Sequence, residues 1–261
     1  MNTITIVLPI SRYKNLETVL TSIELLDTGN NIVSIIAIVD GDESLYVKAR
    51  NLILKMKFEQ KLCVKYRSEE KSSNFNVLIR RKRISDIHNE VKKSISKCDY
   101  IFLLEDDGII KSNALEMLFK EYLIDPYIGF VSGLEIGRWG YPHIGAWTVD
   151  SIYDTKFFYS IDKPQNVTNV DASGFYCLLT RYETYMSHVF KPYGNNQLGP
   201  DVDFGIELRK QGYINKVHDK VLLDHLTDDH IISFSNTETV KLEIGISGNS
   251  SNIKPRLICQ S

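Results

Sequence analysis

The 261-residue chain lacks several features by which proteins are often classified. Its four cysteines form neither a CxxC pair nor a zinc-type spacing, so we expect free thiols and no disulfide framework. No apolar run approaches the roughly 18 residues of a transmembrane helix, and the N-terminus has no basic segment followed by a cleavage site. The net charge of −2 excludes a basic excess for non-specific nucleic-acid binding. These absences predict a cytoplasmic protein without a membrane span.

What is present suits one large α/β domain. Hydrophobic residues make up 43% of the chain and charged residues 25%, which is ample for a buried core. There is no internal repeat and no linker, so we expect a single domain over 1–261. Within it we distinguish a first half over 1–110, a second half over 111–234 and a tail over 235–261. The sequence does not indicate an oligomeric state.

Strand and helix patterns alternate in the first two-fifths of the chain. The runs 4–10, 32–39 and 100–104 are almost wholly apolar, which is typical of strands covered on both faces. Apolar residues at helical spacing lie between and after these runs. The expected helices cover 16–26, 45–57 and 84–95 and begin again at Asn113, with a short strand at 62–66. This order predicts a mostly parallel sheet with helices on both faces.

The second half is less regular. It contains a loop-rich, aromatic region over 135–172 and then a strand over 174–180. A helix follows Asp201 and ends at Gly212, a residue typical of a helix C-terminus. We expect two further strands at 214–217 and 220–224.

Acidic residues follow two of the predicted strands. Asp40 ends the second strand, and Glu105, Asp106 and Asp107 follow the strand at 100–104. In parallel sheets, ligands bind at the carboxyl ends of the strands. Clustered carboxylates repel one another, and Mg²⁺ or Mn²⁺ relieves this repulsion while also binding the oxygens of a nucleotide diphosphate. Taken alone, the triplet is explained better by a solvated acidic turn, so these residues by themselves do not establish a metal site.

Six segments, in order from about residue 3 to 230, resemble motifs of GT-A glycosyltransferases, especially family 2. They are ITIVLPISRYKNLETVLTSI, IIAIVDGDES, CDYIFLLEDDGIIKSNALEML, VDASGFYCLLTR, GPDVDFGIELRKQGY and VLLDHL. The EDD triplet is also similar to that of the N-acetylglucosaminyltransferase I family. The resemblance implies a Rossmann-like, mostly parallel central sheet with helices on both faces and a smaller mixed sheet on the acceptor side. The first half would bind the nucleotide, and the second half the acceptor.

The resemblance also implies roles for particular residues. Asp107 and His225 would hold Mn²⁺ or Mg²⁺. Asp40 would bind the base or ribose, and Glu105 would orient the ribose or a metal-bound water. The full donor site that it implies consists of Pro9, Ser11, Asp40, Glu105, Asp106, Ser173 and Gly174.

The catalytic base has more than one candidate. Asp201 matches the position of the family's base, but Pro200 replaces the glutamate that usually precedes it, so Asp203 is an alternative. An aspartate at a helix start is also a good N-cap. If Asp201 only caps the helix, Asp203 or Asp171 would supply the base. A carboxylate base that activates the acceptor hydroxyl opposite the leaving group predicts inversion at the anomeric carbon.

Three other sequence features have open interpretations. The basic run over 80–83 is either a solvated helix start or a contact for a phosphate-bearing ligand. The segment SDIHNEV departs from the family pattern before the EDD strand, which leaves its donor contacts open. A group of aromatic and histidine side chains suits either an acceptor sugar or an ordinary core. Its members are Trp139, Tyr141, His143 and Trp147.

Together these features predict a metal-dependent, inverting glycosyltransferase of the hexosyl or N-acetylhexosaminyl class. We favour a UDP-sugar donor, and the acceptor hydroxyl could belong to a glycan, a lipid, a protein or a modified nucleic-acid base. A sugar nucleotidyltransferase is the alternative enzyme, although it would need a glycine-rich loop where residues 9–13 have no glycine. A glycosidase would leave the nucleotide-site pattern unexplained. A non-catalytic sugar- or nucleotide-binding protein is the alternative from another class.

Overall fold

The computed structural model describes residues 1–66, 77–135, 145–153, 158–160, 166–191, 199–227 and 231–232. Its helices are α1 (Leu16–Glu24), α2 (Glu43–Ile53), α3 (Val77–Val91), the 3₁₀ turn η1 (Lys92–Ser94), α4 (Ala114–Ile124), α5 (Tyr182–Ser187) and α6 (Pro200–Lys210). Its strands are β1 (Thr3–Ile10), β2 (Ile32–Asp40), β3 (Lys61–Tyr66), β4 (Tyr100–Leu104), β5 (Gly108–Ile109), β6 (Ile128–Glu135), β7 (Ala146–Val149), β8 (Phe158–Ser160), β9 (Val167–Val170), β10 (Ala172–Ser173), β11 (Cys177–Arg181), β12 (Ile214–Leu226) and β13 (Ile231–Ile232).

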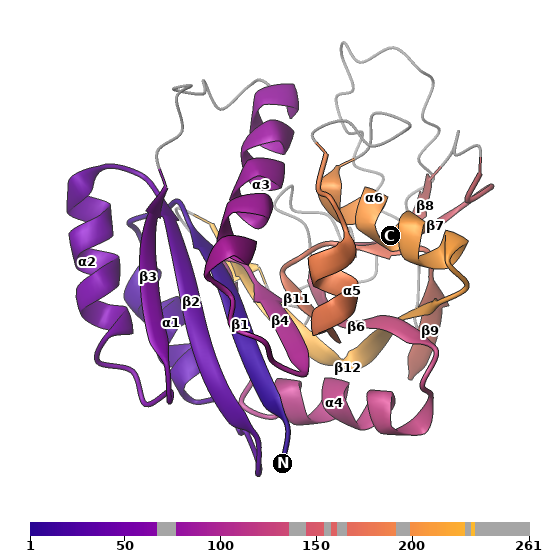
Figure 1. Ribbon diagram of the computed structural model, residues 1–261, viewed down its shortest axis with the longest axis horizontal. Helices are drawn as coiled ribbons and strands as arrows, with labels where there is room; N and C mark the ends of the chain where they lie inside the picture. Colours follow the sequence, from indigo (N-terminus) through magenta and orange to yellow (C-terminus); the bar gives the residue numbers. More distant parts are fainter. Residues whose placement is uncertain are drawn as a thin grey trace, which may run out of the picture.

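A large curled sheet runs through both halves of the described chain. Its strand order is β13-β12-β6-β11-β4-β1-β2-β3, and β5 and β9 pair with β12 beside it. β1 lies parallel to both β2 and β4, and β12 lies parallel to β6. β11 runs antiparallel between β4 and β6. This arrangement confirms the predicted α/β class with a mostly parallel central sheet (Figure 1).

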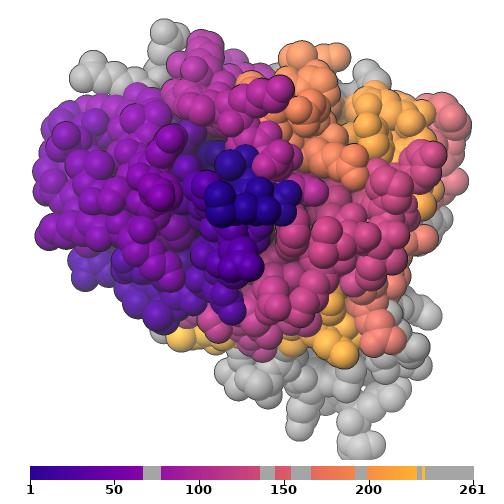
Figure 2. Space-filling view, turned by 60° about the horizontal axis from the view of Figure 1, so that its bottom comes forward, coloured from indigo at the N-terminus to yellow at the C-terminus, as the bar shows by residue number. Residues whose placement is uncertain are grey.

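Helices cover both faces of this sheet, as its apolar strands require. On one face, residues of α1, α2 and α4 form one apolar cluster with alternate residues of the strands, such as Ile6 and Ile35. On the other face, residues of α3, α5 and α6 form a second apolar cluster with the intervening strand residues, such as Val7 and Ile36. Both sets are buried because successive side chains of a strand point to opposite faces. Figure 2 shows the indigo and purple early segments directly against the magenta segment that contains α4.

The smaller sheet consists of β10, β7 and β8 in the described part of the chain. It is antiparallel throughout, because β7 pairs antiparallel with both neighbours. It lies beside α6, whose Val202 and Ile206 form a small apolar cluster with Ala172. The predicted small second sheet is therefore present, and it is antiparallel where a mixed sheet was expected.

Residues 214–217 and 220–224 belong to one long strand. β12 pairs with β6 on both sides of an irregularity that lies between Val217 and Leu222. Asp219 and Lys220 in this stretch are polar, which explains why the apolar pattern suggested two shorter strands. Its length lets β12 continue past the end of β6 to reach β5.

Helix α6 begins at Pro200, with Gly199 as its N-cap residue and Asp201 in its first turn. Asp201 is therefore not at the N-cap position. The helix packs closely on β10, since a side chain at Gly205 would place its Cβ 2.5 Å from the backbone oxygen of Asp171. Gly212 follows the helix with a φ of 88°, a left-handed conformation that favours glycine.

Among the helices of the described ranges, none combines the length and apolarity that crossing a bilayer requires.

Candidate active site

The parallel strands bring Ser11, Asp40 and Glu105 of the sequence-predicted donor site to one edge of the sheet. Ile10 at the end of β1 pairs with Val39, next to Asp40. Val7 pairs with Leu103, so Glu105 emerges from β4 beside the loop that follows β1. A pocket of about 470 Å³ opens at this edge. Its lining residues are Ser11, Tyr13, Gly41, Asp42, Ser44 and Leu45.

Asp106 fixes the loop after β1. Its Oδ2 accepts hydrogen bonds from the backbone N–H of Ser11 at 2.6 Å and of Arg12 at 2.8 Å. Its Oδ1 accepts a third from the Arg12 guanidinium at 3.0 Å. Asp106 is only 5% exposed. Its oxygens therefore serve the loop, and it positions Ser11 at the pocket wall.

Asp107 and His225 lie together because β5 pairs with the end of β12. Gly108 pairs with His225, and the N–H of Leu226 donates to the backbone oxygen of Asp107. The His225 Nε2 atom then lies 3.0 Å from Asp107 Oδ2. Both side chains are buried. The two residues that the sequence analysis proposed as metal ligands are thus in direct contact.

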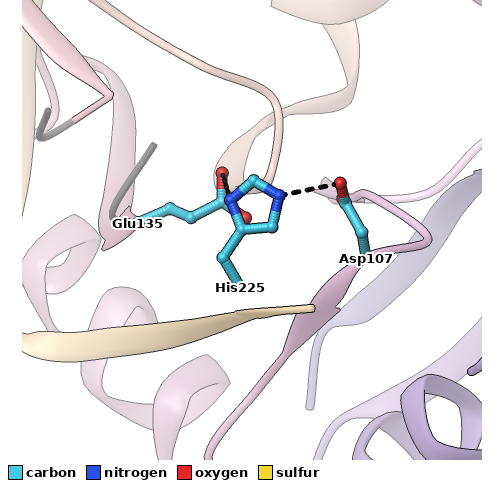
Figure 3. A group of neighbouring side chains, drawn as sticks. All are labelled: Asp107, Glu135 and His225. Carbon is cyan, nitrogen blue, oxygen red and sulfur yellow. Dashed lines mark hydrogen bonds and ion pairs between the residues drawn. The ribbon is translucent and has the colours of Figure 1, made fainter. Parts of the chain in front are cut away.

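Glu135 joins this pair from the end of β6. Its Oε2 lies 3.7 Å from His225 Nδ1, on the other side of the ring from Asp107 (Figure 3). Ligand atoms of Asp107, Glu135 and His225 all lie within 4.8 Å of one another, close enough to share a metal ion. Glu135 is not among the sequence-predicted site residues, because no strand was predicted at 128–135. The run IGFVSGLE ends on one acid after an apolar stretch, and this is the sequence signal for Glu135.

Burial and mutual repulsion raise the pKa values of two carboxyl groups at this site. Burial, followed by repulsion from Asp107, raises the pKa of Glu105 to about 8. The same two causes raise the pKa of Glu135 well above its usual value. Arg12 is the nearby cation, and it forms ion pairs with Asp106 and Asp107. Oε1 of Glu135 has no hydrogen-bond partner among the described residues. A divalent cation fits this set, because it would offset the repulsion and supply a partner for these oxygens.

Asp40 is buried and paired with α3. Arg83 donates from Nε to Asp40 Oδ2 at 2.7 Å and forms an ion pair through its terminal nitrogen. The basic run over 80–83 therefore faces the site in part. Lys82 instead pairs with Asp86 on the helix surface. Burial raises the pKa of Asp201, and the nearby Arg81 and Arg80 oppose this with a smaller effect.

The three candidate bases have different surroundings. Asp201 lies near Glu105, since its charge contributes to the raised pKa of Glu105. Asp203 points instead toward His188, with Oδ2 at 3.8 Å from Nε2. Asp171 pairs with Arg209 at 3.1 Å and accepts the backbone N–H of Val149 at 2.9 Å. Of the three, only Asp201 is therefore placed with the acidic cluster.

The remaining predicted residues lie in the framework around the site. Ser173 is fully buried and accepts a hydrogen bond from the Ser132 hydroxyl at 2.7 Å. The N–H of Gly174 donates to a backbone oxygen at 2.9 Å. Pro9 lies within β1 opposite Ile38. Trp147 packs against the cluster that includes α6, as an ordinary core residue would. Trp139, Tyr141 and His143 lie outside the described residues.

No protein family and no curated protein sequence matches the chain. Solved structures do match in fold. A mannosyltransferase from Pyrobaculum calidifontis, in complex with GDP-Man and Mn²⁺, has a TM-score of 0.56 and 12% identity. GalNAc-T7 with UDP, GalNAc and Mn²⁺ gives the same two values. Both alignments cover 84% of this chain, but only 55% and 42% of the respective neighbours. A197 from STIV, at 12% identity, has a TM-score of 0.47 over 93% of this chain and 98% of its own. The chain therefore has the GT-A fold of these two glycosyltransferases.

Proposed function

We propose that the protein is a metal-dependent glycosyltransferase that moves a sugar from a nucleotide-diphosphate sugar to an acceptor hydroxyl. The observation that carries this proposal is the convergence of Asp107, Glu135 and His225 within 4.8 Å of one another. This cluster lies at the same sheet edge as the pocket that Ser11 and Gly41 line. A nucleotide in that pocket would extend its diphosphate toward the carboxylates.

Asp107 and His225 would hold Mn²⁺ or Mg²⁺ at this edge. When bound, the cation neutralises charge that develops on the departing diphosphate. Residues of the protein would position the donor and balance charge around the cation. Asp106 fixes the loop that carries Ser11, and Arg12 balances part of the charge on Asp107. The paired Asp40 and Arg83 present hydrogen-bonding groups beside the pocket for the base or ribose.

Asp201 is our proposed catalytic base. It would accept the proton of the acceptor hydroxyl as that oxygen attacks the anomeric carbon. Its place near Glu105, and the engagement of Asp203 and Asp171 elsewhere, support this choice. Attack opposite the leaving group gives inversion, which remains part of the proposal. The hexosyl or N-acetylhexosaminyl class remains part of it as well.

We propose the chemical class of the donor. The two glycosyltransferases of similar fold were captured with GDP-Man and with UDP and GalNAc, each together with Mn²⁺. These ligands support a nucleoside diphosphate sugar and a divalent cation for this chain. We retain the UDP-sugar as the first donor to test and the single-domain organisation as a prediction. The cytoplasmic location expected from the sequence also stays a prediction.

A donor screen tests the proposal. Release of UDP or GDP from a panel of nucleotide sugars is measured with Mn²⁺ and again with a chelator, using the wild type and Asp107→Ala. We expect Mn²⁺-dependent release that the variant loses. The control is Asp86→Ala, which removes an exposed carboxylate paired with Lys82 and should release nucleotide as the wild type does. Full activity of Asp107→Ala would refute the metal assignment. Release of pyrophosphate from a nucleoside triphosphate and a sugar phosphate would indicate a nucleotidyltransferase instead.

A further inference from the structure

Arg12 connects the pocket at the sheet edge with the carboxylates of the proposed metal site. Its chain neighbours Ser11 and Tyr13 both line the pocket of about 470 Å³. Its guanidinium forms ion pairs with Asp106 and Asp107, both through Nη1. The Arg12 side chain is 31% exposed, whereas the two carboxylates are buried. A diphosphate that extends from the pocket toward the carboxylates would therefore pass the Arg12 side chain.

Arg12 and His225 approach the same oxygen of Asp107. Nη1 of Arg12 forms its ion pair with Asp107 Oδ2, and His225 Nε2 lies 3.0 Å from that oxygen (Figure 3). Like charges repel, and they do so strongly at a buried site. A divalent cation bound between Asp107 and His225 would therefore compete with the guanidinium for this oxygen.

Arg12 also supplies positive charge to several buried carboxyl groups. Burial raises the pKa values of Glu105, Asp106 and Glu135, and the charge of Arg12 opposes this effect for each of them. Breaking a buried ion pair is costly when one charge is left without a partner. We therefore expect Arg12 to leave Asp107 only when another cation takes its place.

We propose that Arg12 is a diphosphate-binding residue that exchanges partners. It leaves Asp107 when a divalent cation binds there, and its guanidinium then binds the diphosphate of the nucleotide. A guanidinium suits this role, because its planar set of N–H donors can bind phosphate oxygens in pairs. The backbone of the loop stays in place, since Asp106 Oδ2 accepts the N–H groups of Ser11 and Arg12. The inference rests on the proposed function, which supplies both ligands.

This exchange couples the binding of the two ligands. Without a diphosphate, Arg12 loses its contact with Asp107 on metal binding and gains no new partner. With a diphosphate, the displaced guanidinium forms a new ion pair. Arg12 therefore weakens the binding of the metal ion alone and favours its binding together with the nucleotide. By linkage, the metal ion strengthens nucleotide binding by the same factor as the nucleotide strengthens metal binding.

The test compares Arg12→Met and Arg12→Lys with the control Arg209→Met. Arg209 is matched to Arg12, because its side chain is 34% exposed and pairs with the Asp171 carboxylate at 3.1 Å. Calorimetry measures the affinity for Mn²⁺ alone and with saturating UDP or GDP, corrected for the Mn²⁺ that free nucleotide binds. It also measures the affinity for UDP, GDP, uridine and guanosine in the presence of Mn²⁺. Thermal denaturation checks that each variant is folded.

We expect Arg12→Met to bind Mn²⁺ alone about tenfold more tightly than the wild type, because a cation beside the site is removed. With Mn²⁺ present, its affinity for the diphosphate should fall about 10- to 100-fold, which is typical of losing a hydrogen bond to a charged group. Its affinity for the nucleoside should not change. The factor by which nucleotide strengthens Mn²⁺ binding should therefore shrink about 10- to 100-fold.

The two other variants have distinct expected results. Arg12→Lys keeps the charge but not the planar set of donors, so its affinity for Mn²⁺ alone should stay within about threefold of the wild type. It should lose less affinity for the diphosphate than Arg12→Met does. Arg209→Met should match the wild type in every measurement.

Two results would overturn the inference and leave the proposed function intact. If Arg12→Met binds the diphosphate as tightly as the wild type, the guanidinium does not bind it. If Arg12→Met binds Mn²⁺ alone no more tightly than the wild type, Arg12 does not compete with the metal ion. Should Arg12→Met not fold, Arg12→Lys decides, because it must lose more affinity for the diphosphate than for the nucleoside. A wild type that binds neither UDP nor GDP with Mn²⁺ would refute the proposed function together with the inference.

Discussion

His225 Nε2 lies 3.0 Å from Asp107 Oδ2, although 118 residues separate them in the sequence. The contact depends on two strands that meet only in the folded chain, since β5 pairs with the last residues of β12. Both side chains are buried, so the pair is shielded from bulk water. A histidine and a carboxylate in this geometry are suited to share a divalent cation.

If His225 is a ligand, removing its imidazole weakens metal binding. We expect His225→Ala to lose more Mn²⁺ affinity than the roughly 10- to 100-fold that loss of an orienting group causes. Calorimetric titration with Mn²⁺ measures the change. His218→Ala is the control, because His218 lies on the same strand and contacts Lys220 and Asp219 instead of the acidic cluster. Equal affinities of both variants for Mn²⁺ would contradict the assignment.

The choice of base predicts different effects for two neighbouring aspartates. Asp201→Asn should lower kcat by about 100-fold or more, because general base catalysis contributes about 10²- to 10⁴-fold. Asp203→Asn should keep kcat within about threefold, since Asp203 faces His188. Steady-state kinetics on the donor found by the screen measures both. If Asp203→Asn is the inactive variant, the base has been assigned to the wrong residue.

The sequence could have predicted that the side chains of Asp201 and Asp203 point in different directions. Residues two apart on a helix point in directions about 200° apart. Asp201 and Asp203 therefore could not both face the site once a helix begins at Pro200. Which of them faces it depends on how α6 packs on β10, and Gly205 permits that close approach. That packing is a tertiary feature with no local signal.

The parallel half of the sheet could be predicted because its strands are continuous apolar runs. The same pattern placed Asp40 and Asp107 at strand ends, where the structure has them. Glu135 was missed although it also ends a buried strand, because a single acid after an apolar run is a weak signal. The structural role of Asp106 could not be predicted, because its hydrogen-bond partners are backbone N–H groups of a loop 94 to 95 residues away in the sequence.

Asp106 should matter more for stability than for catalysis. Asp106→Ala leaves the N–H groups of Ser11 and Arg12 without their acceptor and removes a buried charge partner of Arg12. We expect a loss of about 2 to 4 kcal/mol in the free energy of unfolding, measured by urea denaturation. Asp99→Ala is a matched control, because Asp99 accepts the N–H and hydroxyl of Thr3 at an exposed site. It should cost less, since water replaces the lost contacts. Equal losses would argue against the loop role of Asp106.

The buried His88 makes stability depend on pH. Burial lowers the pKa of His88 to about 3, with Lys92 and His188 adding to the effect. In the unfolded chain its pKa is about 6.5. Below pH 6.5 the unfolded chain therefore binds a proton that the folded protein does not. Stability from this residue is complete above pH 6.5 and falls by about 1.4 kcal/mol per pH unit as the pH decreases toward 3.

Replacing His88 tests this dependence. His88→Gln lacks the titrating ring, so its free energy of unfolding should fall less steeply than that of the wild type between pH 6.5 and 4. The difference in slope should be about 1.4 kcal/mol per pH unit. Urea denaturation at several pH values measures it, and above pH 7 the two proteins should show the same slope. Parallel curves across the acidic range would show that His88 is not held neutral.

The most direct test of the whole account is a Mn²⁺ titration followed by electron paramagnetic resonance in the presence of UDP or GDP. We predict that the wild type binds one Mn²⁺ per chain and that the nucleotide tightens this binding. Asp107→Asn, which keeps the size of the side chain and removes its charge, should lose the bound ion. A variant that binds Mn²⁺ as tightly as the wild type would contradict the central claim that Asp107 anchors the metal at a nucleotide-sugar site.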